Sequence, residues 1–201
     1  QSIPYIEMDF SRLQREYLLT SNDDMSAHLD EKVINKLNSS SKWQDDMKEH
    51  FEQILKDREF LIYNIFHKKQ DSTIFYPVCF SRIINNVKAN LEKYMNGGLL
   101  SDLNPKYVLD TINDLSEELY VSKANPGNRF IQILIRCYLS PKQVLFNYKF
   151  NKDAFDHVIQ HVKHRFYDAI ANPSEMVGVV AAQSIGEPAT QLSVLSRSKI
   201  L

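Results

Sequence analysis

The residues with the clearest potential for chemistry are three histidines on one predicted helix. His157, His161 and His164 are spaced by four and three residues, so they share one broad helical face. Imidazoles at this spacing are a familiar metal-binding arrangement. However, no Cys or carboxylate lies in register with them as a further ligand, whereas Lys163 and Arg165 lie beside them. The pattern therefore favours a solvated basic patch that contacts phosphate over a metal site.

Other catalytic constellations are absent from the sequence. It contains no paired carboxylates, no Ser-His-Asp set and no phosphate-cradling glycine loop, so it shows no self-contained active site. Cys79 and Cys137 are too few and too far apart for a zinc site. Two thiols in a chain of this size indicate a reducing compartment, with both cysteines in the core. No catalytic residue and no metal ligand is predicted within the chain.

The composition is that of a globular protein in which acidic and basic residues are nearly balanced. The 201 residues are 43% hydrophobic, which is enough to build a core. Lys plus Arg total 24 against 25 Asp plus Glu, giving a net charge of −1, so any nucleic-acid contact must be local. No run approaches the ~20 apolar residues of a membrane span, and no membrane association is expected. The first residues show neither an initiator methionine nor a signal peptide, which predicts a piece of a longer protein.

The elements that position these residues are predicted to be mainly helical. Apolar residues recur every three or four positions over 24–37, 42–66, 79–95, 104–119, 128–139 and 151–171. Asp23 or Asp24 is a candidate cap for the first of these helices, and Asn104 with Pro105 begins the fourth. An extended segment is predicted at 73–77, and looser ones at 3–10 and 144–150. The predicted fold class is therefore mainly α with one or two short β elements.

The stretch 172–191 is the most restricted in residue type, and no charge occurs over 176–186. Asn172 is predicted to cap a helix that begins at Pro173, with Glu175 completing a capping-box-like pattern. A helix that is apolar or small on every side is buried. A buried helix is therefore predicted here.

Small residues recur on one face of this helix, at Gly178, Ala182 and Gly186, so that another element can approach closely. The helix is predicted to break at Gly186-Glu187-Pro188, because proline cannot donate the next helical hydrogen bond. Pro188 then begins a second helix with a polar first turn. By physics alone the stretch is also consistent with a tightly packed core helix followed by a bend.

A long motif in this stretch resembles a known family. The run Glu175-Met-Val-Gly, followed by Ala181-Ala-Gln-Ser-Ile-Gly-Glu-Pro-Ala-Thr-Gln191, resembles the segment that leads into the trigger loop of multisubunit DNA-directed RNA polymerases, in their largest subunit. The arrangement over 57–191, which includes Asp57-Arg-Glu59 and Tyr76-Pro77, resembles the foot region of the RNA polymerase II type and of its large-DNA-virus homologues. Bacterial subunits lack this insertion. The Asn- and Lys-rich composition tilts the resemblance towards the viral kind.

The resemblance implies roles for particular residues. Gln191 matches a glutamine near the sugar of the incoming nucleotide, and Gly186, Glu187 and Pro188 match the elbow that acts as a hinge. The buried helix that anchors this elbow would contain Met176, Gly178, Ala181, Ala182, Gln183 and Ser184. The first 150 residues would form a foot-like helical domain, and 151–194 a cleft segment with the start of the trigger-loop helix.

Agreement with the family weakens after Gln191. Leu192 and Ser193 are acceptable, but Val194 replaces the Leu or Met that packs on the nucleotide base. The residues 195–201 depart altogether, and the family's histidine on the phosphate side is missing. We expect this divergent tail to be foreign to the family, as intron, intein or assembly read-through. The family's magnesium-binding aspartate loop also lies outside the sequence.

The function implied by the resemblance is template-directed RNA synthesis within a multisubunit nucleotidyltransferase. No cofactor is expected on this chain, and Mg²⁺ is expected in the complete enzyme. The implied partners are other polymerase subunits, the DNA template, the RNA product and nucleoside triphosphates. The implied location is the nucleus, or the virion or cytoplasmic viral factory. A different class remains open, namely a non-catalytic helical interaction module that binds polymerase subunits or transcription factors.

Overall fold

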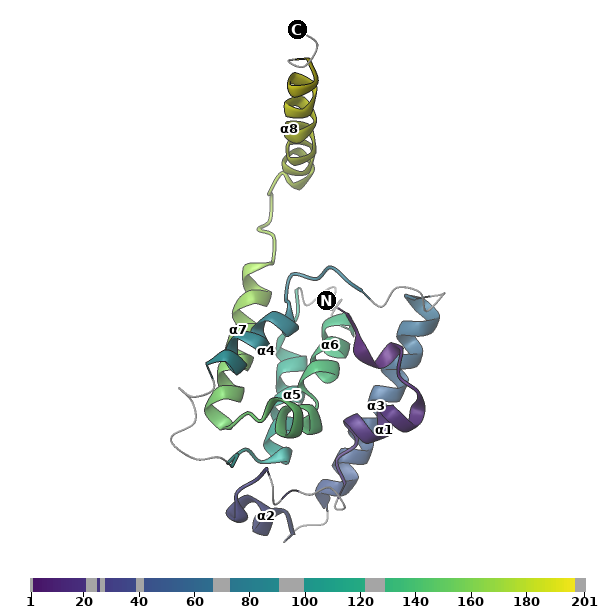
Figure 1. Cartoon of the computed structure of the whole chain (residues 1–201), viewed down its shortest axis with the longest axis vertical. Coiled ribbons are helices and arrows are strands. Elements are labelled where there is room, and N and C mark those ends of the chain that lie inside the picture. Colours follow the sequence, from purple (N-terminus) through teal and green to yellow (C-terminus); the bar gives the residue numbers. More distant parts are fainter. Residues whose placement is uncertain are drawn as a thin grey trace. The chain divides into compact units, whose positions relative to one another are not determined.

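The computed structural model is helical over most of its length, which confirms the predicted mainly α fold (Figure 1). It describes residues 2–20, 25, 28–38, 42–66, 73–90, 100–121 and 129–197. The chain forms two compact units, Gln1–Ala169 and Ile170–Leu201, and each is described by itself. Among the described residues, no helix combines the length and the apolar character that a membrane crossing needs.

The first unit is built almost entirely from helices. Its elements are η1 (Pro4–Ile6), α1 (Phe10–Tyr17), α2 (Glu31–Asn38), α3 (Lys42–Asn64), α4 (Phe80–Ala89), α5 (Pro105–Glu118), α6 (Arg129–Leu139), the π-helical η4 (Gln143–Tyr148) and α7 (Lys152–Asp168). Helices α3 to α7 confirm five of the predicted helices. The β structure of the described residues consists of two isolated bridges, Ser2 with Thr73 and Leu29 with Ser101.

The first predicted helix is shorter than expected. Helix α2 begins at Glu31, whereas the apolar period predicted a helix from about residue 24. The proposed caps Asp23 and Asp24 lie outside the described residues. Leu29 lies before the helix, in the bridge with Ser101, because the Ser101 N–H donates to the His28 carbonyl at 2.9 Å. Among the described residues, the segment before α2 therefore combines a single turn, closed by the hydrogen bond from the Leu29 N–H to the Met25 carbonyl at 2.9 Å, with the pairing to Ser101.

Two predicted extended segments are helical instead. The N-terminal segment forms η1 and then α1, in which Leu13 and Tyr17 are buried one turn apart. Two buried positions are too few to reveal a helical period. The loose alternation of apolar residues over 3–10 therefore led to the wrong prediction of an extended segment. Residues 143–148 form the π-helix η4, which ends at Lys149 in the left-handed region with φ of 55°. Its Val144 and Leu145 are fully buried, and such a short apolar run fits either structure.

Helix α6 lies at the centre of the first unit, and it packs on α3, α4 and α5 (Figure 1). Seven of its eleven residues are buried, namely Ile131, Ile133, Leu134, Ile135, Cys137, Tyr138 and Leu139. A helix with apolar residues on most of its circumference must be covered on several sides. Cys137 is therefore a core residue as predicted, whereas Cys79, at the start of α4, is only half-buried.

Helix α7 belongs to the first unit, because its apolar face packs along α4. Phe155, Val158 and Val162 are fully buried on this face. The Asn151 side chain caps the helix by accepting a hydrogen bond from the Ala154 N–H at 3.2 Å. The border predicted at residue 150 consequently falls inside the compact unit, which extends to Ala169.

The capping pattern at Asn104 is confirmed. Its side-chain oxygen accepts a hydrogen bond from the Lys106 N–H at 2.9 Å, and Pro105 occupies the first helical position. The side-chain cap and the proline both act within three residues, so the start of α5 is specified without a tertiary contact.

The second unit contains the helix α8 (Val177–Arg197), which begins later than predicted. Asn172 does not cap a helix at Pro173. Its carbonyl accepts a hydrogen bond from the Glu175 N–H at 3.3 Å, and Ser174 has a φ of 73°. A left-handed residue directly after Pro173 cannot continue a right-handed helix, so the segment forms a turn first.

Helix α8 also runs without a break through Gly186-Glu187-Pro188, so the predicted interruption at this position is wrong. Proline removes one backbone donor, but the neighbouring helical hydrogen bonds remain. The Thr190 hydroxyl donates to the Glu187 carbonyl at 2.8 Å, which adds a local contact across the same turn. Gly186 to Pro188 therefore form a weakened turn within one helix.

The predicted burial of this helix is not found within its own unit. Met176 is 71% exposed and Ile185 is 75% exposed, and Val177, Val179 and Val180 are also exposed. A lone helix and its lead-in turn have no second layer to cover an apolar face. Residue type predicted that α8 prefers burial, but it could not supply the covering surface.

Candidate functional site

The residues of the polymerase-like motif all lie on or next to α8. Met176 precedes the helix, and the remaining anchoring positions Gly178, Ala181, Ala182, Gln183 and Ser184 occupy its first turns, with all six exposed. The hinge positions Gly186, Glu187 and Pro188 follow in the middle.

The nucleotide-contact prediction concerns the later part of α8. Gln191 lies in the helix, and its side chain is outside the described part of the structure. Residues 195–197 continue the same helix, whereas residues 198–201 of the divergent tail lie outside the described residues.

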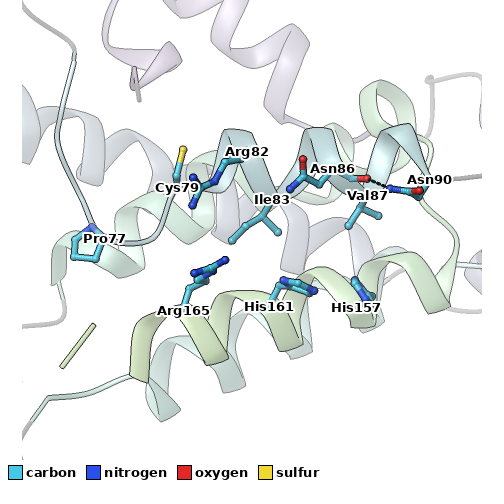
Figure 2. A pocket seen from close by; sticks show the side chains of 10 residues that line it. All are labelled: Pro77, Cys79, Arg82, Ile83, Asn86, Val87, Asn90, His157, His161 and Arg165. Atoms are coloured by element: carbon cyan, nitrogen blue, oxygen red, sulfur yellow. Dashed lines mark hydrogen bonds between the residues drawn. The ribbon is translucent and has the colours of Figure 1, made fainter. Parts of the chain in front are cut away.

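A groove between α4 and α7 brings together basic side chains from both helices (Figure 2). It has a volume of about 240 Å³. Helix α7 contributes His157, His161 and Arg165, which follow one another along its face towards α4. Helix α4 contributes Arg82, with Asn86 and Asn90 one and two turns further on.

The histidine spacing is only partly used in this groove. The rings of His157 and His161 lie 4.5 Å apart between centroids, whereas His164 Nδ1 lies 2.6 Å from Asp168 Oδ2. Lys163 likewise points elsewhere, because its Nζ lies 2.5 Å from Glu118 Oε2. Among the described residues, no group of three or more His, Cys, Asp or Glu side chains is placed to hold a metal ion. Of the predicted basic patch, His157, His161 and Arg165 line this groove, whereas His164 and Lys163 pair with carboxylates.

The electrostatics of the groove are set by positive charge. Burial lowers the pKa of His161, and the neighbouring His157, Arg165 and His164 lower it further. Arg82, Asn86 and Asn90 were not foreseen as members of the site. They lie some 75 positions earlier in the chain, and nothing in their local sequence indicates a site, since only the packing of α4 on α7 brings them there.

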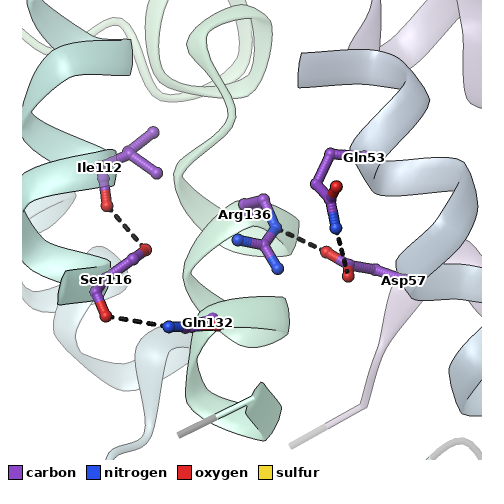
Figure 3. A network of polar contacts seen from close by, with 6 residues as sticks. All are labelled: Gln53, Asp57, Ile112, Ser116, Gln132 and Arg136. Carbon is purple, nitrogen blue, oxygen red and sulfur yellow. Dashed lines mark hydrogen bonds and ion pairs between the residues drawn. The ribbon is translucent and has the colours of Figure 1, made fainter. Parts of the chain in front are cut away.

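A second polar cluster connects α3 with α6 (Figure 3). Arg136 Nε donates to Asp57 Oδ2 at 2.5 Å, and the Gln53 amide donates to Asp57 Oδ1 at 3.2 Å. The Asp57 side chain is 1% exposed and that of Arg136 is 12% exposed, so this is a buried ion pair. Nearby, Gln132 donates to the Ser116 carbonyl at 3.0 Å and ties α6 to α5. The geometry is that of a structural clamp between helices.

His50 lies in a polar hollow of about 420 Å³ beside this ion pair, with Arg136 on the same wall. Its Nε2 atom is buried and has no hydrogen-bond partner among the described residues. Burial, and then the charge of Arg136, lowers the pKa of His50 to about 4. The folded state therefore resists protonation of this imidazole.

This pKa predicts a loss of stability in mild acid. Between about pH 6.5 and pH 4 the unfolded chain binds a proton at His50 that the folded chain does not, so folding stability falls as the pH falls through this window. The expected contribution is up to about 3 kcal/mol. Urea unfolding at pH 7 and at pH 4.5 measures it, with His50→Leu as the comparison. The wild type should lose more stability than His50→Leu, and equal losses would contradict the prediction.

Comparison with protein families shows the family to which the chain belongs. Residues 1–169 match the family described as RNA polymerase Rpb1, domain 6. The match ends at the residue where the first compact unit ends, so it covers that whole unit. The chain belongs to the family RNA polymerase Rpb1, domain 6, and it serves transcription as part of the largest subunit of a multisubunit DNA-directed RNA polymerase, an enzyme complex.

Proposed function

We propose that this chain combines the foot region of an RNA polymerase II type or large-DNA-virus largest subunit with the segment that leads into its trigger loop. The single observation that carries the proposal is a boundary in the chain after Ala169. The compact unit and the family match both end at Ala169, and the trigger-loop-like motif 175–191 follows on a separate helix. On this proposal, one chain holds a supporting domain and a mobile element.

Helix α8 is proposed to move over the incoming nucleotide and to bend at Gly186–Pro188. Pro188 lacks the N–H that would bond the Ser184 carbonyl, so this turn is held by fewer hydrogen bonds than its neighbours. A Cβ added at Gly186 would meet no atom within 4 Å, so no packing in the described structure requires a glycine there. We therefore propose that Gly186, next to the hydrogen bond missing at Pro188, loosens the helix at this turn. Closing motions of this kind often limit turnover.

Gln191 is proposed to contact the sugar of the nucleoside triphosphate, with the DNA template and RNA product bound by the assembled enzyme. The described residues do not fit a magnesium site, because they place no suitable group of carboxylates together. The Mg²⁺ of the complete enzyme is therefore proposed to bind residues of the polymerase outside this chain.

Stiffening the proposed hinge should slow nucleotide addition in a complete polymerase that contains this chain. Gly186→Ala raises helix propensity by about 1 kcal/mol and should slow single-nucleotide addition by about fivefold, while Pro188→Ala restores a hydrogen bond and should slow it at least as much. Rapid-quench measurement of one addition step tests this.

The matched control is Gly178→Ala in the same helix. It adds the same helix propensity, and its new Cβ also meets no atom within 4 Å. Wild-type rates in all three variants would sink the hinge proposal, as would equal slowing by Gly178→Ala and Gly186→Ala.

The proposed location is the nucleus for a cellular polymerase, or the virion or cytoplasmic viral factory for a viral one. Fluorescence imaging of the tagged polymerase in its own host cells decides between them. Recovery in mitochondria would contradict both.

A non-catalytic interaction module is the second candidate, because the first unit has a continuous core of its own from Ile3 to Phe166. Expression of the whole chain discriminates the two. A soluble monomer with one cooperative melt supports the module, whereas aggregation that disappears with Ile185→Glu supports an α8 surface that is normally covered by a larger assembly.

A further inference from the structure

The groove between α4 and α7 carries positive charge that the surrounding protein does not neutralise. Six polar side chains line it, namely Arg82, Asn86, Asn90, His157, His161 and Arg165 (Figure 2). No carboxylate is among the lining residues. Within the described part of the chain, no ion pair engages Arg82 or Arg165.

Nearby carboxylates are already engaged elsewhere. Asp168 pairs with His164, Glu118 pairs with Lys163, and Asp156 accepts a hydrogen bond of 2.8 Å from the Tyr107 hydroxyl. Asp168 and Asp156 lie on α7 itself, yet neither lines the groove. Arg82 and Arg165 thus have no protein counter-ion in the described residues. An anion supplied from outside would lower the repulsion between these groups.

The donor set matches a phosphate group in kind and in number. Each guanidinium offers a planar fork of N–H donors, which binds phosphate oxygens in pairs. The Asn86 and Asn90 side chains add amide donors, although one N–H of Asn90 already bonds the Asn86 carbonyl at 2.8 Å. Buried Ile83 and Val87 form the apolar floor of the groove. Arg82 and Arg165 enter from opposite helices, so a bound anion would bridge α4 and α7.

We propose that the α4–α7 groove is a binding site for a single phosphate dianion, free or as a phosphomonoester. Its volume of about 240 Å³ suits one such group better than a nucleic-acid strand, which needs an extended basic track. The net charge of −1 for the whole chain agrees, since the positive charge is concentrated at one place. A second hollow over Gln160 and His164 adjoins the groove and offers room for the rest of an ester.

Titration of the full chain with inorganic phosphate at constant ionic strength tests the site. Binding is followed by NMR through the imidazole signals of His157 and His161, with sodium chloride as the competing salt. Arg82→Gln and Arg165→Gln should each weaken phosphate binding by about tenfold, because each removes a charge-assisted fork. Arg165→Lys keeps the charge, loses the fork and should give an intermediate loss.

Arg12→Gln is the matched control. It removes the same charge from an exposed site on α1, where Arg12 pairs with Glu16 at 2.8 Å, and phosphate affinity should stay unchanged. Arg82 and Arg165 are exposed, so their variants should retain the wild-type melting temperature. Equal affinity in the groove variants and in Arg12→Gln would overturn the proposal.

Two further ligands identify the source of the phosphate. Phenyl phosphate that binds at least as tightly as inorganic phosphate indicates a phosphomonoester, whereas weaker binding indicates the free ion. A short oligothymidylate carries only phosphodiesters. Binding of the oligothymidylate without binding of inorganic phosphate would overturn the proposal in favour of a nucleic-acid contact.

Discussion

Replacing Asp57 by alanine is expected to destabilise the first unit by about 3–5 kcal/mol, because the change leaves the largely buried Arg136 guanidinium without its counter-ion. The change removes the acceptor of two hydrogen bonds, one donated by Arg136 Nε at 2.5 Å and one by the Gln53 amide at 3.2 Å. Such a loss is a large share of the stability of a domain of this size. Urea unfolding at pH 7, followed by circular dichroism, measures the effect.

The double variant Asp57→Met with Arg136→Met is the control. It removes both charges and fills the site with apolar side chains, so it should recover most of the stability that either single variant loses. Recovery would show that the cost comes from an unpaired buried charge rather than from lost volume. Additive losses in the double variant would contradict that account of the clamp.

Replacing Phe155 by alanine is expected to cost about 3–5 kcal/mol, since a large aromatic side chain would leave a cavity in the core. Phe155 is fully buried on α7, and its ring packs edge-on against Tyr107 of α5 at 6.4 Å between centroids. The variant also tests the assignment of α7 to the first unit. A single cooperative transition at lower denaturant concentration is expected for the whole unit.

Phe75→Ala provides the comparison, because that ring is fully exposed and its loss should change stability by less than about 0.5 kcal/mol. A separate, early transition for α7 in Phe155→Ala would instead support an independent segment that begins near residue 151. Similar stabilities for Phe155→Ala and Phe75→Ala would contradict the burial described for α7.

Local signals predicted the helices best. Asn104 and Pro105 specify the start of α5 within a few residues, and the apolar periods of α3 and α7 extend over several turns each. Helix α1 was missed because its eight residues hold only two buried positions. The π-helical segment η4 was predicted as extended because a short apolar run does not distinguish a strand from a helix.

The candidate site could likewise be predicted only in part. The histidine spacing predicted a basic patch on α7, but the two members that complete it most directly, Arg82 and Asn86, come from α4. The sequence likewise did not predict that Arg136 is the buried partner of Asp57, because the two residues are 79 positions apart. Long-range pairs of this kind depend on how helices dock, and docking is not a property of any local pattern.

What the sequence determined by itself was the fold class, most helix positions and, through the motif 175–191, membership in the largest-subunit family that the match over 1–169 bears out. These depend on hydrogen bonding and side-chain period within a few turns. The tertiary structure alone decided that α7 joins the first unit, that α8 is continuous through Pro188, and that two arginines face each other across a groove. The first and third of these follow from which surfaces of α4 and α7 become buried together, and burial is a property of the whole packed unit. The continuity of α8 follows from the helical hydrogen bonds that remain around Pro188.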